Sequence, residues 1–123
     1  DVEYNQGYSS IYNTIAHYPA DLYKSTIGFC SFILPKPTFR LIGSFDENFK
    51  GAYFEDNDYE RRLRLKKLSV IISSWLNPVI YRESSSIKKD PSLNSHYQDN
   101  ARYYVNKWGG HRGGEKFITP FNK

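Results

Sequence analysis

The sequence predicts a domain of mixed α and β structure, and three segments with distinct patterns support this. An apolar run over Thr26–Leu34 has the length of one buried strand and is followed by prolines, which end strands. Four carboxylates precede five cations over Glu55–Lys67, the charge order that the helix dipole favours. Apolar side chains recur every three or four positions over Asn94–Trp108, as they do on one face of an amphipathic helix.

Length and composition limit the class of protein. The 123 residues suffice for one domain with an apolar core. The sequence contains no stretch of about 18 apolar residues, the length that could span a membrane. The formal net charge of +4 suits a phosphate-bearing ligand, nucleic acid or an anionic membrane surface. Aromatic residues make up 17% of the chain, which favours packing and stacking on flat ligands such as sugars or bases. The composition restricts the partner but does not choose it.

The single cysteine and the start of the chain bear on the compartment. Cys30 lies in an apolar run, so we expect a buried and reduced thiol, and one cysteine cannot form an internal disulfide. The chain begins without an initiator Met and without the basic and apolar regions of a signal peptide. We therefore expect a cytoplasmic location and an upstream part before Asp1.

The first half of the chain is expected to hold one strand and one short helix. Residues 1–25 are rich in Tyr, Ser and Asn with weak periodicity, which predicts an irregular lead-in with a short helix near Ser10–Ala16. The buried strand over 26–34 follows. A short helix then begins near Pro37, which a first helical turn tolerates, and ends at Gly43.

A charged helix over Asp56–Lys67 opens the second half. Asp58 with Arg62, and Glu60 with Arg64, have the i,i+4 spacing and order that stabilise a helix, each pair by roughly 0.2–0.5 kcal/mol. A purely structural role would therefore explain most of these charges, although it does not explain why two acids are adjacent at the helix start.

The rest of the second half alternates strand, loop and helix signals. Short strands are predicted in Leu68–Trp75 and Asn77–Glu83, a polar mobile loop over 84–95, and the amphipathic helix over Asn94–Trp108. A Gly-rich basic tail, residues 109–123, ends the chain. The expected buried face of the helix consists of Tyr97, Ala101, Tyr104, Val105 and Trp108.

Three short stretches occur in a characteristic order: "GSFDENF" at Gly43–Phe49, "EDND" at Glu55–Asp58 with Arg61 and Arg62 beyond it, and "KWGG" at Lys107–Gly110. This order resembles the C-terminal half of family 2 glycosyltransferases of the bacterial and phage type, which commonly carry "GGFDE-x-F" and an "ED-x-D" helix start. The resemblance covers roughly residues 26–123. It implies the mixed-sheet portion of a nucleotide-diphospho-sugar transferase (GT-A-like) α/β fold that lacks the N-terminal nucleotide-binding half, so this polypeptide alone is expected to be incomplete.

By this resemblance, Asp56 is the general base of an inverting transferase, and Glu55 helps to hold the acceptor or the local geometry. Asp56 and Asp58 also satisfy the letters of a D-x-D metal motif. The family's metal-binding motif belongs at a strand end in the N-terminal half, so we expect no metal ligand in this chain and a divalent cation, Mg²⁺ or Mn²⁺, in the complete enzyme. Asp58 is expected to cap the helix or to pair with Arg62.

Five further residues are candidates for substrate binding. Arg82 stands where many relatives have a His that helps to hold the metal or diphosphate; it could contact phosphate oxygens directly or pair with a surface acid. Arg112 and Lys116 could fold over a diphosphate, or the tail could be solvated and flexible. Asp46 is a turn former or helps to shape the acceptor site. Trp108 is a core residue or stacks on a sugar.

The leading functional interpretation is a hexosyl- or glycosyltransferase, or its acceptor-side half. It would transfer a sugar from a nucleotide-diphosphate donor to a glycan or another hydroxyl acceptor, possibly with the missing N-terminal half as its partner. One alternative is a non-catalytic carbohydrate-binding or assembly domain derived from the same fold. A nucleic-acid-binding module is the other alternative, which the basic charge permits, but no RNA-recognition, zinc-finger or helix-turn-helix signature is present.

Overall fold

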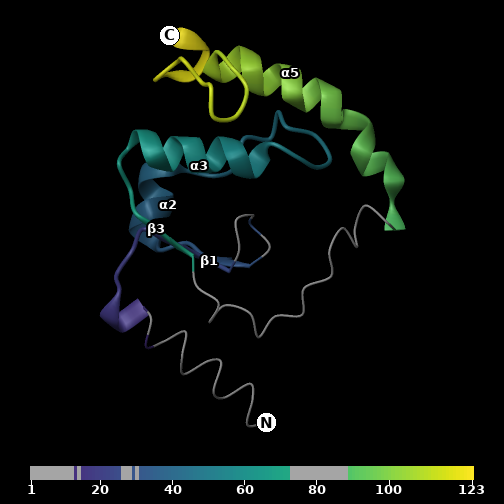
Figure 1. Ribbon diagram of the computed structural model, residues 1–123. Coiled ribbons are helices and arrows are strands. Elements are labelled where there is room, and N and C mark those ends of the chain that lie inside the picture. Colours follow the sequence, from purple (N-terminus) through teal and green to yellow (C-terminus); the bar gives the residue numbers. More distant parts are fainter. Residues whose placement is uncertain (1–12, 14, 26–28, 30, 73–88) are drawn as a thin grey trace. The chain divides into compact units, whose positions relative to one another are not determined.

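The computed structural model describes residues 13, 15–25, 29, 31–72 and 89–123 (Figure 1). The chain forms two compact units, the first from residues 1–44 and 66–82 and the second from residues 45–65 and 83–123. Helices occur together with a small mixed sheet, so the predicted α/β class is confirmed at this level. The transferase fold and the single domain stay predictions.

The first unit holds a three-stranded sheet in the order β2-β1-β3. Its strands are β1 (Leu22–Lys24), β2 (Phe32–Ile33) and β3 (Val70–Ile72). The central strand β1 runs antiparallel to β2 and parallel to β3, with Tyr23 opposite both Ile33 and Ile71. All three residues of β1 are buried, so this strand is the centre of the sheet.

The predicted strand over 26–34 is confirmed in part, as β2, but its predicted burial is wrong. Among its described residues only Phe32–Ile33 lie in a strand, and Phe32 is exposed at the edge of the sheet. The buried strand is β1, within the segment predicted to be irregular. Three residues between polar neighbours are too few to show a period of two, and this is why the pattern missed β1.

Other predictions for the first unit had mixed outcomes. The short helix is confirmed as α2 (Lys36–Ile42), which ends where the Gly43 amide donates a 2.7 Å hydrogen bond to the Phe39 carbonyl. The strand predicted in Leu68–Trp75 is confirmed over β3. Described residues 13 and 15–17 are helical, in agreement with the short helix near Ser10–Ala16. The predictions for Cys30, Trp75 and the strand Asn77–Glu83 lie outside the described residues.

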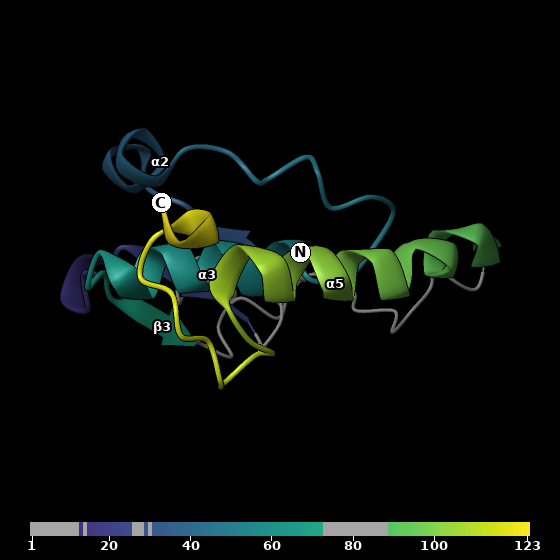
Figure 2. The ribbon, with the colours of Figure 1, turned by 90° about the horizontal axis from the view of Figure 1, so that it is seen from above.

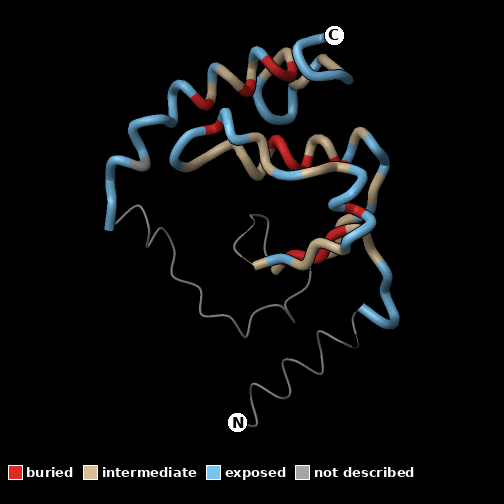
Figure 3. The backbone as a smooth tube through the Cα atoms, turned by 180° about the vertical axis from the view of Figure 1, so that it is seen from behind, coloured by how far each residue is buried: buried red, intermediate tan, exposed pale blue. Residues whose placement is uncertain are grey.

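In the second unit, α3 (Glu55–Leu65) and α5 (Tyr97–Trp108) lie side by side (Figures 1 and 2). Buried residues of this unit gather on these two helices and on the loop before α3 (Figure 3). The apolar core consists of Phe49, Tyr104 and Trp108, with Phe54, Leu65 and Tyr103 packed against it.

Both helices of this unit were predicted, with shifted ends. The chain leaves α3 through Lys67, which has a left-handed φ of 57°. The segment Pro91–His96 forms the 3-10 helix η2, in which the Asp90 carboxylate accepts a hydrogen bond from the Ser92 amide, so α5 begins at Tyr97 and this part of the predicted mobile loop is ordered. None of the helices in the described ranges combines the length and the apolar character that a membrane crossing requires.

The predicted buried face of α5 needs a correction. Tyr104 and Trp108 are buried as expected, but Tyr97 is 44% exposed. The polar side chains of Asn100 and Lys107 share the buried face instead. A pattern that counts only apolar residues could not place them there, because both are buried through their polar partners.

The tail is folded onto α5, contrary to the alternative of a flexible tail. The amides of Lys116 and Phe117 donate hydrogen bonds of 3.0 and 2.9 Å to the Trp108 carbonyl. The 3-10 helix η3 (Pro120–Asn122) follows, and its Phe121 ring packs edge-on against Tyr103 at 5.7 Å. Gly109 ends α5 with φ 75°, directly beside the Phe117 ring.

Replacing Gly109 by Ala should destabilise the chain more than replacing Gly113 by Ala. Both glycines have positive φ, 75° and 89°, so either Ala costs roughly 1–2 kcal/mol of left-handed strain. At Gly109 the new Cβ would lie 2.8 Å from the Phe117 ring, whereas Gly113 has nothing within 4 Å. The clash should add roughly 1–3 kcal/mol. Urea unfolding measures both losses, and equal losses would contradict the packing of the tail described above.

Candidate functional site

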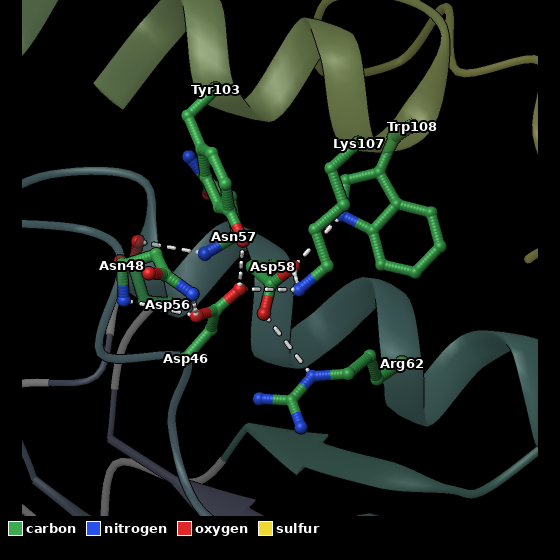
Figure 4. Close-up of polar contacts among 9 residues, drawn as sticks. All are labelled: Asp46, Asn48, Asp56, Asn57, Asp58, Arg62, Tyr103, Lys107 and Trp108. Carbon is green, nitrogen blue, oxygen red and sulfur yellow. Dashed lines mark hydrogen bonds and ion pairs between the residues drawn. The ribbon is translucent and has the colours of Figure 1, made fainter. Parts of the chain in front are cut away.

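The acidic run at the start of α3 is divided between two environments. The carboxylate of Asp58 is fully buried, at 0% exposed, and meets three donors: the Lys107 ammonium at 2.8 Å, the Trp108 indole N–H at 2.9 Å and the Arg62 Nε at 3.1 Å (Figure 4). The buried Glu60 lies 3.9 Å from an Arg64 nitrogen. Asp58 and Glu60 are therefore both buried and paired with cations of the unit. The predicted pairing of Asp58 with Arg62 is confirmed.

Asp46 belongs to the same buried network. Its Oδ2 accepts hydrogen bonds from the Lys107 ammonium at 2.7 Å and the Tyr103 hydroxyl at 2.8 Å, and its Oδ1 accepts one from the Asn48 amide at 3.0 Å (Figure 4). Burial alone would raise the pKa of Asp46, but these hydrogen bonds hold it well below its usual range. Burial and the same hydrogen bond raise the pKa of Tyr103 to about 12. The Asn48 and Phe49 amides donate to the Asp46 side chain and carbonyl, so Asp46 forms a turn, one of its two predicted roles.

The other two acids, Glu55 and Asp56, line a pocket at the start of α3. The pocket has a volume of about 520 Å³ and is open to solvent. Its wall continues through Asn57, and the Asn57 amide donates a 2.8 Å hydrogen bond to the Asp56 carboxylate. The remaining lining residues are Ala52, Tyr53, Phe54, Tyr97 and Arg112. Three aromatic rings, two carboxylates and one guanidinium therefore surround one space.

The two pocket acids differ from Asp58 in their electrostatics. Burial is the largest effect on Glu55 and raises its pKa; a backbone hydrogen bond opposes the rise, and the neighbouring Asp56 carboxylate adds a smaller increase. No Lys or Arg ion pair to Glu55 or Asp56 is found among the described residues. A carboxyl group with a raised pKa in a pocket is the kind of group that exchanges protons with a ligand.

The backbone that leads into the pocket is strained. Tyr53 and Phe54 have φ of 81° and 73°, values that a residue with a side chain adopts only at a cost of roughly 1–3 kcal/mol. Both rings pack on Tyr97, at centroid distances of 5.1 and 5.2 Å. Such strain persists where the surroundings hold it, and it is common at binding sites.

Arg112 reaches the pocket from the tail. The loop that carries it is fixed by Glu115, which accepts hydrogen bonds from the Gly113 amide at 2.9 Å and from the Tyr104 hydroxyl at 2.5 Å. The Arg112 side chain is 49% exposed, and its guanidinium lies 3.7 Å from the Glu60 carboxylate. The Gly-rich tail therefore supplies the pocket with a cation, Arg112. The role of Arg112 in substrate binding stays a prediction.

The remaining predicted site residues lie elsewhere. Trp108 is buried, and its indole N–H is engaged by Asp58, so it is a core residue and its faces cannot stack on a sugar. Lys116 is exposed and does not line the pocket, and neither does Asp46. Arg82 lies outside the described residues.

Sequence reasoning missed the aromatic wall. Of Tyr53, Phe54 and Tyr97, only Tyr97 was part of a prediction, as a member of a buried helix face. Their spacing carries no signal for a pocket, because the loop and α5 meet only in the folded chain. The buried Asn100 was missed as well, although an Asn in the middle of an apolar helix pattern does signal a polar contact.

The described residues do not fit a metal centre. No three His, Cys, Asp or Glu side chains converge in that part of the chain. Within Asp56-Asn57-Asp58, the second acid is enclosed by Lys107, Arg62 and Trp108, so the two carboxylates cannot share a cation.

Comparison of the chain with protein-family models, curated proteins and solved structures gave no match. A functional proposal therefore rests on the geometry of the pocket and on the short motifs around it.

The raised pKa of Glu55 predicts how stability depends on pH. The folded chain keeps the Glu55 proton to a higher pH than the unfolded chain, whose pKa is near the ordinary 4.5. Stability from this group is therefore lost as pH rises from about 4.5 through the raised value. Glu55→Gln removes this loss, so the variant should gain on the parent over that window and be the more stable at pH 7.

Urea unfolding between pH 4 and pH 7 measures the difference between Glu55→Gln and the parent. Carboxyl NMR titration of Asp56→Asn gives an independent check, because removing the Asp56 charge should bring the pKa of Glu55 closer to its ordinary value. A stability difference that stays flat with pH would contradict the assignment.

Proposed function

We propose that the second unit forms the acceptor side of a glycosyltransferase and that the pocket at the start of α3 binds the acceptor sugar. One observation carries the proposal: of the four acids in a single run, Glu55 and Asp56 line the pocket described above and Asp58 and Glu60 do not, and three aromatic residues line it with them. The order of the motifs around these acids, similar to that of family 2 glycosyltransferases, supports the same assignment.

The aromatic wall suits a carbohydrate. Tyr53, Phe54 and Tyr97 offer ring faces and edges to the apolar C–H face of a hexose. Carboxylates accept hydrogen bonds from sugar hydroxyls, and the Arg112 guanidinium donates them, so the polar groups can bind the rim of the same ring. A volume of about 520 Å³ is within the range of small-molecule sites.

Asp56 acts as the general base in this proposal. Its carboxylate takes the proton from an acceptor hydroxyl, whose oxygen forms a bond to the anomeric carbon of the donor sugar. The bond from that carbon to the nucleotide diphosphate breaks on the opposite face, and the diphosphate leaves with the electron pair. Glu55, beside the base, can hold the acceptor by a hydrogen bond. The donor and any divalent cation would bind outside the described residues.

Two observations weigh on the alternatives. Many cations of the second unit are paired with acids, among them Arg62, Lys107 and Arg112, which leaves less positive surface for nucleic acid. A non-catalytic carbohydrate-binding domain would use the same pocket and the same aromatic wall. The two adjacent acids in an open pocket favour catalysis, because a general base has to lie within reach of the acceptor hydroxyl.

Asp56→Asn separates catalysis from binding. Asn has the size of Asp and leaves the pocket shape intact, so sugar affinity should change less than about tenfold, or 1.4 kcal/mol. Transfer should slow roughly 100-fold or more, because the base is lost. Amide NMR of the full chain with glucose, galactose or N-acetylglucosamine measures binding, with shifts expected at residues 52–57, 97 and 112. Release of nucleotide diphosphate, in a polypeptide that also carries the donor-binding half, measures transfer.

Arg102→Ala is the matched control, because Arg102 is an exposed cation of α5 that pairs with Asp99 and does not line the pocket. It should bind sugar and support transfer as the parent does. Sugar-induced shifts that avoid the pocket residues would refute the acceptor site. Parental transfer by Asp56→Asn would refute the base and leave a carbohydrate-binding domain.

A further inference from the structure

Asn100 is a buried polar residue of α5 that neither the Asp58 network nor the pocket lining includes. It is the fourth residue of the twelve-residue helix and is 2% exposed. Asn is a poor residue for a helix interior because its amide competes for backbone hydrogen bonds, and burying that amide is costly unless every polar atom is satisfied. Its presence therefore calls for a specific set of partners.

Those partners are backbone groups of the loop before α3. The Asn100 Oδ1 accepts a 3.0 Å hydrogen bond from the Lys50 amide. Its Nδ2 lies within donating distance of three carbonyls, those of Lys50 at 2.8 Å, Ala52 at 2.9 Å and Tyr53 at 3.2 Å. One side chain thus satisfies backbone groups of three residues, both as acceptor and as donor.

The loop segment that Asn100 binds, residues 50–53, includes Tyr53 and is followed by Phe54, the two strained residues. Tyr53 and Phe54 have positive φ, and the Phe54 carbonyl accepts the 2.9 Å hydrogen bond from the Asp58 amide that begins the helical ladder of α3. Ala52, Tyr53 and Phe54 form the pocket wall next to Glu55 and Asp56. A change in the backbone at Tyr53 would therefore move the wall and the first turn of α3 together.

We propose that Asn100 is a positioning residue of the pocket. It holds residues 50–53 by their backbone, keeps Tyr53 and Phe54 in their left-handed conformations, and so fixes the aromatic wall against the two acids. The occupant of the pocket, an acceptor sugar, is taken from the proposed function; the control of the backbone does not depend on it. Asn suits this role because it carries a donor and an acceptor in one plane, whereas Asp lacks the donor and would face three carbonyls with a negative charge.

Asn100→Ala tests the proposal in the full chain. Without the amide, Tyr53 and Phe54 should relax to negative φ. NMR detects this as the loss of the strong cross-peak between each residue's own amide and α protons, which a positive φ produces. Affinity for the sugar that gives the largest shifts with the parent should fall roughly tenfold or more, because the ligand would have to order the wall itself. The Trp108 indole N–H signal reports whether the core beneath is intact.

Asn106→Ala is the matched control. It makes the same substitution on α5 at an exposed position that does not line the pocket. This variant should retain both cross-peaks and the parental affinity. Asn100→Ser, which keeps one donor, takes the place of Asn100→Ala if the Ala variant does not fold.

The outcomes separate this proposal from the function on which its ligand rests. Unchanged cross-peaks at Tyr53 and Phe54 in a folded Asn100 variant would overturn the positioning role, whatever the chain binds. Loss of the Trp108 signal in both Asn100 variants would overturn a role confined to the pocket, because the residue would then hold the whole unit. If the parent binds no sugar but Asn100→Ala loses the cross-peaks, the proposed function fails and the positioning role stands.

Discussion

The second unit depends on one buried ion pair, between Asp58 of α3 and Lys107 of α5. Removing two charges from water is costly, and the cost is offset only when the remaining donors and acceptors are satisfied. Here they are: Asp58 also accepts from Trp108 and Arg62, and Lys107 also donates to Asp46. Aromatic rings enclose the ammonium, with Phe49, Tyr103 and Trp108 centred 5.4 to 6.0 Å away. The pair therefore fixes how the two helices meet.

The acids one turn earlier in the chain belong to the pocket. Glu55 and Asp56 are the first two residues of α3, so they lie at its open end, where they line the pocket. The buried network provides the rigidity, and the strained loop held by Asn100 provides the wall. The buried network and the pocket thus use neighbouring residues of a single acidic run.

The sequence predicted the parts of this arrangement that depend on local physics. The charge order gave α3, Pro37 and Gly43 bounded α2, and the i,i+4 spacing gave the pairing of Asp58 with Arg62. These features are decided within a few residues. The choice of Glu55 and Asp56 as site acids came instead from the resemblance to glycosyltransferases, and their role stays a prediction.

The rest depends on contacts across about fifty residues and could not be predicted from a pattern. No sequence pattern assigned Lys107 a partner, because its two carboxylates, Asp46 and Asp58, are distant in the chain. Trp108, a candidate for sugar stacking, is buried, and its indole N–H donates a hydrogen bond to Asp58. The strand β1 was too short for its periodicity to show.

The central claim is that the acidic run is divided between a structural acid and pocket acids, and the free energy of unfolding of two matched variants tests it most directly. Asp58→Asn and Asp56→Asn make the same substitution two residues apart in one helix. The first removes one of the two carboxylates that face Lys107 in the buried network and should cost on the order of 3 kcal/mol. The second changes a group in an open pocket and should stay within about 0.5 kcal/mol of the parent in urea unfolding at pH 7. Equal losses in the two variants would contradict the account.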